Sequence, residues 1–191
     1  MRVSRVEAAQ SRERIIESAA NQFRQHGFDG IGLAELMKSA GMTHGAFYGH
    51  FESKEALMAI AAERAMNNSV DAWQELAKTS EKDAFHTVVS SYLSPAHRDK
   101  PGAGCTLAAL GAESARHSSP VRVAFTKGVR AAVKLLISLV PGESERAQRE
   151  RALVTYASMV GALVLARAVD DDELSEEILR SVLVSIAPNK A

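Results

Sequence analysis

Apolar positions recur every three or four residues along nearly the whole chain, which is the spacing of one buried helix face. The pattern is clear near the start, where Ile15, Ile16 and Phe23 share a face before Gly27. No segment shows the strict apolar–polar alternation of a half-buried β-strand. The periodicity therefore predicts an all-α protein with about nine helices.

Residues 32–54 contain two short helical patterns separated by a break at Gly41. Glycine takes the left-handed conformation that ends many helices, so Gly41 is predicted to end the first pattern. Thr43 then stands where a hydroxyl side chain caps the next helix. Two short helices joined by a tight turn are typical of a helix-turn-helix unit.

The second of these patterns has only two positions that require a core, Phe47 and Phe51. Its other positions carry hydroxyl, imidazole and glycine groups, so small residues lie beside hydrogen-bonding ones. A helix of this kind can approach a surface rich in acceptors, as the recognition helix of a DNA-binding protein does in the major groove. We predict a three-helix DNA-binding domain over residues 1–54 and a larger helical domain over residues 55–191.

The last two predicted helices carry more apolar surface than one core needs. Val154, Met159, Leu163 and Val184 lie off their main apolar stripes. A helix that is apolar around most of its circumference is covered on several sides. Two such helices from each of two subunits form a four-helix interface, and we predict a homodimer through the last two helices. A central position in a monomeric bundle is the alternative.

Composition and charge restrict the location of the protein. No apolar run reaches the length of about 18 residues that a membrane span needs, and the first residues lack the apolar segment of a secretory signal. We therefore expect a cytoplasmic protein without a membrane partner. A single cysteine, Cys105, allows no internal disulfide and fits a reducing compartment.

The formal net charge of +0 excludes nucleic-acid binding by bulk electrostatics alone. The charges are nevertheless unevenly distributed, because acidic residues cluster between 170 and 177. The basic cluster lies at the start and consists of Arg2, Arg5, Arg12 and Arg14. This asymmetry fits a DNA-contacting end opposite an acidic end.

Several segments of the first third of the chain occur in the order and spacing of one known family. They are residues 14–23 (RIIESAANQF), 27–28 (GF), 33–36 (LAEL), 40–51 (AGMTHGAFYGHF) and 53–57 (SKEAL). In these segments the chain resembles the TetR/AcrR family of bacterial transcriptional regulators. The remaining two thirds resemble the family in length and helical character, and residues 104–109 are similar to a segment of one subgroup.

The resemblance implies a homodimer that binds a palindromic operator in double-stranded DNA, commonly as a repressor, and that a small-molecule effector releases. It implies no cofactor. Thr43, His44, Gly45 and Ala46 match the groove-facing start of the recognition helix, and Tyr48, His50 and Lys54 match positions that hold phosphates. The family usually has Thr or Ser where this chain has Gly32, so a phosphate-binding hydroxyl is absent there.

The chemistry of these residues supports the same roles. Phenol, imidazole and ammonium groups all donate hydrogen bonds to phosphate oxygens, which position a protein without specifying sequence. Base recognition would then fall to the methyl groups of Thr43 and Ala46 and to the ring of His44. For His44 the alternative is an exposed helix residue without a partner.

Large apolar residues and hydroxyl groups between Leu57 and Leu165 are candidates for an effector pocket. They are Trp73, Phe85, Tyr92, Cys105, Phe125, Tyr156 and Met159. For each of them, a position in the ordinary core is the alternative. Cys105 could sense an electrophile or an oxidant if a helix start stabilises its thiolate, and a small buried hydrophobe is the alternative.

The sequence fits two other classes of protein less well. An enzyme would need a nucleophile, a paired carboxylate or a phosphate loop, and Cys105 with the histidines matches neither such a motif nor a metal site. A helical protein-interaction module without a DNA role would leave residues 43–50 unexplained. We therefore predict a non-enzymatic, ligand-responsive transcriptional regulator.

Overall fold

The computed structural model describes residues 5–80, 83–142 and 144–188, so Arg2 lies outside the described residues. Within them the chain forms nine α-helices and two 3-10 helices, and no strand. The prediction of an all-α protein with about nine helices is confirmed. The elements are α1 (Arg5–His26), α2 (Leu33–Ser39), η1 (His44–Gly49), α3 (Lys54–Thr79), α4 (Ala84–Tyr92), α5 (Pro95–Arg98), η2 (Pro101–Ala103), α6 (Thr106–Ser114), α7 (Ser119–Leu139), α8 (Glu145–Ala168) and α9 (Asp172–Ile186).

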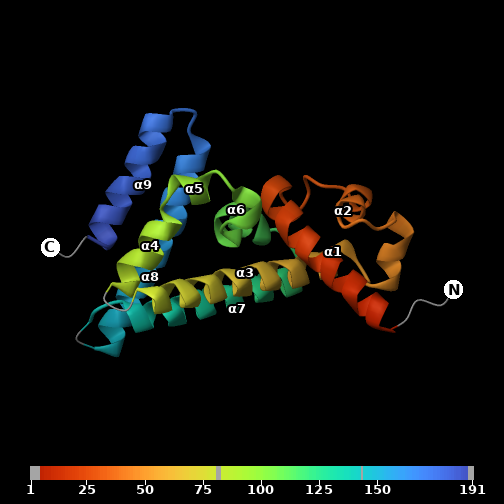
Figure 1. Cartoon of the computed structure of the whole chain (residues 1–191), viewed down its shortest axis with the longest axis horizontal. Coiled ribbons are helices and arrows are strands. Elements are labelled where there is room, and N and C mark those ends of the chain that lie inside the picture. The colour runs from red at the N-terminus through yellow and green to blue at the C-terminus, as the bar shows by residue number, and fades with distance from the viewer. Residues whose placement is uncertain (1–4, 81–82, 143, 189–191) are drawn as a thin grey trace.

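Two long helices, α3 and α7, run side by side and connect the two ends of the molecule (Figure 1). At one end lie α1, α2 and η1, and at the other end α8 packs against α9. Helix α6 lies against α1 and also contacts α7 and α8. The short N-terminal helices are therefore linked to the distant end both through α3 and through α6.

The helix ends and caps predicted around the helix-turn-helix are confirmed, with one exception. Gly27 and Gly41 have φ values of 82° and 71°, the left-handed conformation that follows a helix. Ser53 caps α3 by accepting a hydrogen bond from the amide of Ala56 at 3.0 Å. Thr43 is the N-cap of η1, but its hydroxyl makes no capping bond, so the expected side-chain cap is wrong.

The second short helix is a 3-10 helix rather than an α-helix. The amide of Ala46 bonds to the carbonyl of Thr43, and the amide of His50 bonds to that of Phe47, each three residues back. Two glycines within six residues weaken an α-helix, because each costs about 1 kcal/mol relative to alanine. The tighter helix instead takes its stability from the aromatic side chains that it buries.

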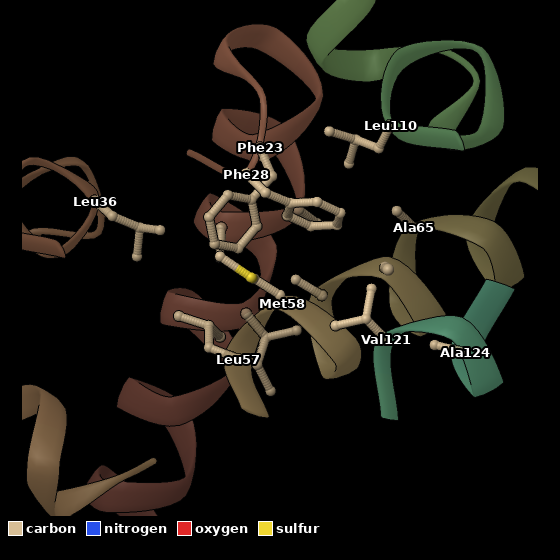
Figure 2. Close-up of a cluster of buried hydrophobic side chains, with 14 of the residues drawn as sticks. Phe23, Phe28, Leu36, Leu57, Met58, Ala65, Leu110, Val121 and Ala124 are labelled. Atoms are coloured by element: carbon tan, nitrogen blue, oxygen red, sulfur yellow. The ribbon is translucent and has the colours of Figure 1, made fainter. Parts of the chain in front are cut away.

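A continuous hydrophobic cluster joins the N-terminal helices to the rest of the protein (Figure 2). Phe23 and Phe28 pack edge to face, with ring centroids 5.3 Å apart. Around them lie Leu36 from α2, Leu57 from α3 and Leu110 from α6. The cluster crosses the boundary expected at residue 54, so the N-terminal helices are packed against the larger part rather than separated from it.

Helix α8 is the one helix in the described part of the chain that is long and apolar enough, by length and composition, to cross a membrane. Packing within the protein accounts for this composition, because Met159 and Leu163 are fully buried in the core beside α9. The prediction that Met159 and Leu163 are apolar residues in excess of what the core needs is therefore wrong. Val154 and Val184 do remain exposed, by 62% and 61%.

Candidate functional site

The 3-10 helix η1 presents its polar side chains on the surface. Thr43, His44 and Gly45 are exposed, and Tyr48 is 67% exposed. The ring of Tyr48 lies edge-on to that of His44, with centroids 6.0 Å apart. These side chains thus form one exposed group with hydroxyl and imidazole donors directed away from the core.

Two phenylalanines hold this helix in place. Phe47 and Phe51 are 1% and 5% exposed, and their ring centroids are 5.6 Å apart. The guanidinium of Arg12 on α1 lies 5.1 Å from the centroid of the Phe51 ring, within cation–π distance. A recognition element fixed by buried aromatic rings loses little conformational freedom when it binds.

Lys54 lies at the start of α3 and already has two partners. Its ammonium donates to the carbonyl of Phe28 at 2.7 Å and to that of Ile31 at 2.8 Å. The side chain therefore closes the loop between α1 and α2, and one N–H is left for a phosphate. Periodicity could not predict this role, since the carbonyl acceptors come from a loop more than twenty residues earlier.

Gly32 is the N-cap of α2 and has an extended backbone, with φ −75° and ψ 153°. It makes no side-chain capping bond, as expected for glycine, and nothing lies within 4 Å of the position that a Cβ would occupy. The structure thus has room for the hydroxyl residue that the chain lacks. Neither packing nor backbone strain requires the glycine.

A cavity of about 720 Å³ lies between α1, α3, α7, α8 and the segment from α4 to α6. Four of the seven candidate pocket residues line it: Trp73, Tyr92, Cys105 and Tyr156. The structure does not bring the other three to this cavity. Phe85 and Met159 pack in the core clusters, and Phe125 lines a separate depression of about 420 Å³.

The apolar side of the cavity is an aromatic wall. The ring of Trp73 lies edge-on to Tyr92, at 5.7 Å between centroids, and to Tyr156, at 5.9 Å. Burial, and then the nearby Cys105, raises the pKa of the Tyr92 phenol well above its usual value. Burial also raises the pKa of Tyr156. Both phenols are therefore neutral O–H donors near pH 7.

His97 holds the segment that leads into α6. Its Nε2 accepts a hydrogen bond from the amide of Cys105 at 3.0 Å, so the ring is neutral and Nδ1 donates to the carbonyl of Tyr92 at 2.6 Å. Burial lowers the pKa of His97, which favours this neutral form. A Cβ at Gly104 would meet His97 Nε2 and Arg167 Nη2 at 2.9 Å each, so this close approach requires glycine.

Three side chains join the N-terminal helices to the elements around the cavity through four polar contacts. Arg24 on α1 lines the cavity and donates from Nε to the carbonyl of Gly102 at 2.8 Å. At the other end of α6, Glu113 accepts a hydrogen bond from the amide of Phe28 at 2.8 Å. Arg64 on α3 forms two ion pairs of 2.6 Å with Glu13 and Glu17 on α1.

These contacts and the exposed helix η1 together define a class of protein. A helix-turn-helix unit with an exposed second helix is the class of protein that places this helix in the major groove of DNA. No group of three or more His, Cys, Asp or Glu side chains that could hold a metal ion is found among the described residues.

Comparison with known proteins shows a similarity to one family of bacterial regulators. Residues 15–60 match the model of the bacterial regulatory proteins of the tetR family. The HTH-type transcriptional repressor NemR of Escherichia coli (strain K12) is 29% identical over 187 residues, which cover 93% of this chain and 94% of NemR. In its N-terminal sequence and over its whole fold, the chain is therefore similar to transcriptional regulators of the TetR family, which are DNA-binding proteins rather than enzymes.

Solved structures agree with this assignment. The crystal structure of E. coli NemR in its reduced form has a TM-score of 0.77 and 27% identity, with 95% of this chain and 97% of that chain covered. A TetR-family regulator from Cytophaga hutchinsonii has a TM-score of 0.78 at 20% identity, with 100% and 99% covered, and shows the same fold. Repressors of this family bind DNA operators and typically form dimers.

Proposed function

We propose that this protein is a cytoplasmic repressor that binds a palindromic operator as a homodimer and is released by a small molecule in the 720 Å³ cavity. The observation that carries this proposal is the shared helix α1. Arg12 on α1 contacts Phe51, which follows η1 and packs on Phe47 within it, and Arg24 on the same helix lines the cavity. A molecule in the cavity therefore touches an element of the DNA-binding unit directly.

In the complex that we propose, η1 enters the major groove. Thr43, His44 and Ala46 face base edges, while Tyr48, His50 and the free N–H of Lys54 contact phosphates. Gly45 and Gly49 support close approach to DNA, because a Cβ at either position would meet nothing within 4 Å in the protein. Their open surroundings leave room for the DNA backbone.

The proposed dimer interface is an apolar stripe on α8 together with exposed positions of α9. On α9 these positions include Leu174 and Val184. On α8 the stripe consists of Leu153, Val154, Ala157, Gly161, Val164 and Leu165, all exposed in the single chain. Apolar residues exposed together on one face are typical of a protein–protein interface. Pairing the stripes about a two-fold axis forms a four-helix interface and sets the distance between the two η1 helices.

Selection of bound fragments from a genomic DNA library tests the DNA-binding proposal. We expect enrichment of one palindrome whose half-site centres lie about 34–36 Å apart, and an affinity that falls steeply with salt. Strong salt dependence without enrichment of any sequence would contradict the regulator proposal. Enrichment of an asymmetric site would contradict the symmetric dimer.

A second proposal for the effector is an electrophile or an oxidant that reacts with Cys105. The thiol lines the cavity at the N-cap of α6, where its sulfur accepts a hydrogen bond from the amide of Ala108 at 3.4 Å. The crystal structure of the relative NemR is that of its reduced form, and this supports a redox-active effector for a similar regulator. A thiolate here is oxidised by hydrogen peroxide to a sulfenate as the O–O bond breaks and water leaves.

Replacing Cys105 with serine tests this second proposal. We expect hydrogen peroxide to release operator DNA from the wild-type protein and not from Cys105→Ser, because serine is not oxidised under these conditions. Release is measured by fluorescence anisotropy of labelled operator, and dithiothreitol should restore binding. Equal release from both proteins would eliminate the cysteine as the sensor.

A further inference from the structure

The cavity contains a guanidinium group, that of Arg24, that forms no ion pair with the described residues, although the charge of Glu17 acts to raise its pKa. Arg24 is half-buried on α1, and burial lowers its pKa, although it stays charged at any physiological pH. Its Nε donates to the carbonyl of Gly102, and no carboxylate of the described residues lies within 4.0 Å of it. Two of its nitrogen atoms are therefore free to donate in parallel to an incoming anion.

The acidic residue nearest to this group along α1 is already neutralised. Glu17 lines the cavity, but its carboxylate is bound by Arg64 at 2.6 Å. Asp99, the acid that interacts with Arg167 behind Gly104, is likewise bound by Arg98 at 2.7 Å. The acids near the cavity therefore have cationic partners of their own.

Other cationic groups reinforce this excess of positive charge. Lys100 lines the cavity and forms no ion pair with the described residues. Arg167 uses Nε and Nη2 to bind the carbonyls of Arg98 and His97, while its buried Nη1 has no hydrogen-bond partner there. A buried positive potential is stronger than an exposed one because water screens it less.

The rest of the cavity lining includes an apolar part and one further donor without a strong partner. Trp73 and Tyr156 form its aromatic wall, together with Val70, Leu107 and Ala132. The Tyr92 hydroxyl is fully buried beside the Cys105 thiol, which is only a weak partner, and it makes no hydrogen bond to a nitrogen or oxygen atom of the described residues. A donor in this position costs free energy unless a bound molecule supplies an acceptor.

We propose that the effector is a small organic acid, with an apolar body against Trp73 and Tyr156 and a carboxylate bound by Arg24. The volume of about 720 Å³ is in the range of pockets that enclose small molecules. This inference rests on the proposed function, because it assigns a chemical class to the molecule that fills the effector cavity. It requires no covalent reaction with Cys105.

The position of Arg24 gives such an acid a route to the DNA-binding unit. Its guanidinium now ties α1 to the carbonyl of Gly102, three residues before Cys105 and α6. A carboxylate that binds the two free nitrogen atoms pulls on the guanidinium that holds this carbonyl through Nε, and so shifts α1 relative to η2. Because Arg64 ties α3 to α1 through Glu13 and Glu17, such a shift also reaches the start of α3.

The fluorescence of Trp73 should report binding in the cavity, because Trp73 is the single tryptophan of the chain and lines the cavity. We would titrate the protein with two matched pairs, 4-phenylbutanoate against 4-phenylbutanamide and octanoate against octanamide, and follow tryptophan fluorescence. Each acid is expected to bind about 10- to 100-fold tighter than its amide, as a charge-assisted bond to arginine provides. In Arg24→Gln this ratio should fall to about 1, whereas Arg24→Lys should keep part of it.

Arg149→Gln is the matched control, because it removes the same charge from an exposed position of α8 and should leave the ratio unchanged. Equal binding of acid and amide, a ratio that survives in Arg24→Gln, or no saturable binding of either acid at millimolar concentration would overturn the proposal. Operator binding is measured on the same samples. An acid that binds as expected without releasing DNA would refute the effector function while leaving the acid site intact.

Discussion

Substituting tryptophan for Gly161 is expected to lower operator affinity about 10²–10⁴-fold, because it separates the two subunits that bind the two half-sites together. Gly161 lies in the middle of the exposed α8 stripe, between Ala157 and Leu165. A Cβ at this position meets nothing within 4 Å in the single chain, so the large side chain fits one subunit and collides only with a partner helix. Analytical ultracentrifugation should show a monomer, and anisotropy with labelled operator should show the loss of affinity.

The matched control for this substitution is Ser138→Trp, which adds the same side chain at an exposed position of α7. It should remain a dimer with unchanged operator affinity. Gly161→Trp itself should melt no earlier than a wild-type monomer, because replacing a mid-helix glycine removes a helix penalty of about 1 kcal/mol. A dimeric Gly161→Trp protein would place the interface elsewhere on the molecule.

Removing the Tyr48 side chain is expected to weaken binding to all DNA sequences alike, by about 10- to 100-fold for a dimer that loses one phosphate contact in each half-site. His44→Ala should instead change the preference at one position of the half-site, where a base contact contributes about 1–3 kcal/mol of discrimination. Both residues are exposed on η1, and neither is needed for the core. Binding to a library of operator variants measures both effects in one experiment.

Tyr48→Phe separates the hydroxyl from the ring in this experiment. If the hydroxyl donates to phosphate, phenylalanine should weaken binding nearly as much as alanine does. Loss of sequence preference in Tyr48→Ala, with a uniform loss of affinity in His44→Ala, would mean that the two roles are exchanged. Unaltered binding in both variants would exclude η1 as the recognition element.

Helical periodicity and turn residues were sufficient to predict the fold class and the helix-turn-helix. Apolar spacing is a local property, and a glycine with positive φ such as Gly27 or Gly41 ends a helix wherever it occurs. The burial of Phe47 and Phe51 followed from the same argument, since the rest of their helix is small or polar. The 3-10 geometry of that helix was not predicted, although its two glycines weaken an α-helix.

The polar interior was beyond sequence reasoning because each of its contacts joins distant parts of the chain. Arg24 binds a carbonyl 78 residues later, and Glu113 binds an amide 85 residues earlier. Neither residue was among the candidates, although both connect the cavity to the N-terminal helices. The sequence could not distinguish the large apolar residues that line the cavity, Trp73 and Tyr156, from those that do not, namely Phe85, Phe125 and Met159. Only the packing of the helices decides which of these side chains reach the cavity.

The placement of Arg24 also bears on protein engineering by domain exchange. Regulators of this kind are natural candidates for chimeras in which one N-terminal unit replaces another at a junction near residue 54. In this chain such a junction passes through the cavity, because Glu17, Asn21 and Arg24 line it from the N-terminal side. A transplanted unit would bring its own residues at these three positions into the host cavity. The chimera would then acquire a new operator preference and a changed response to effectors at the same time.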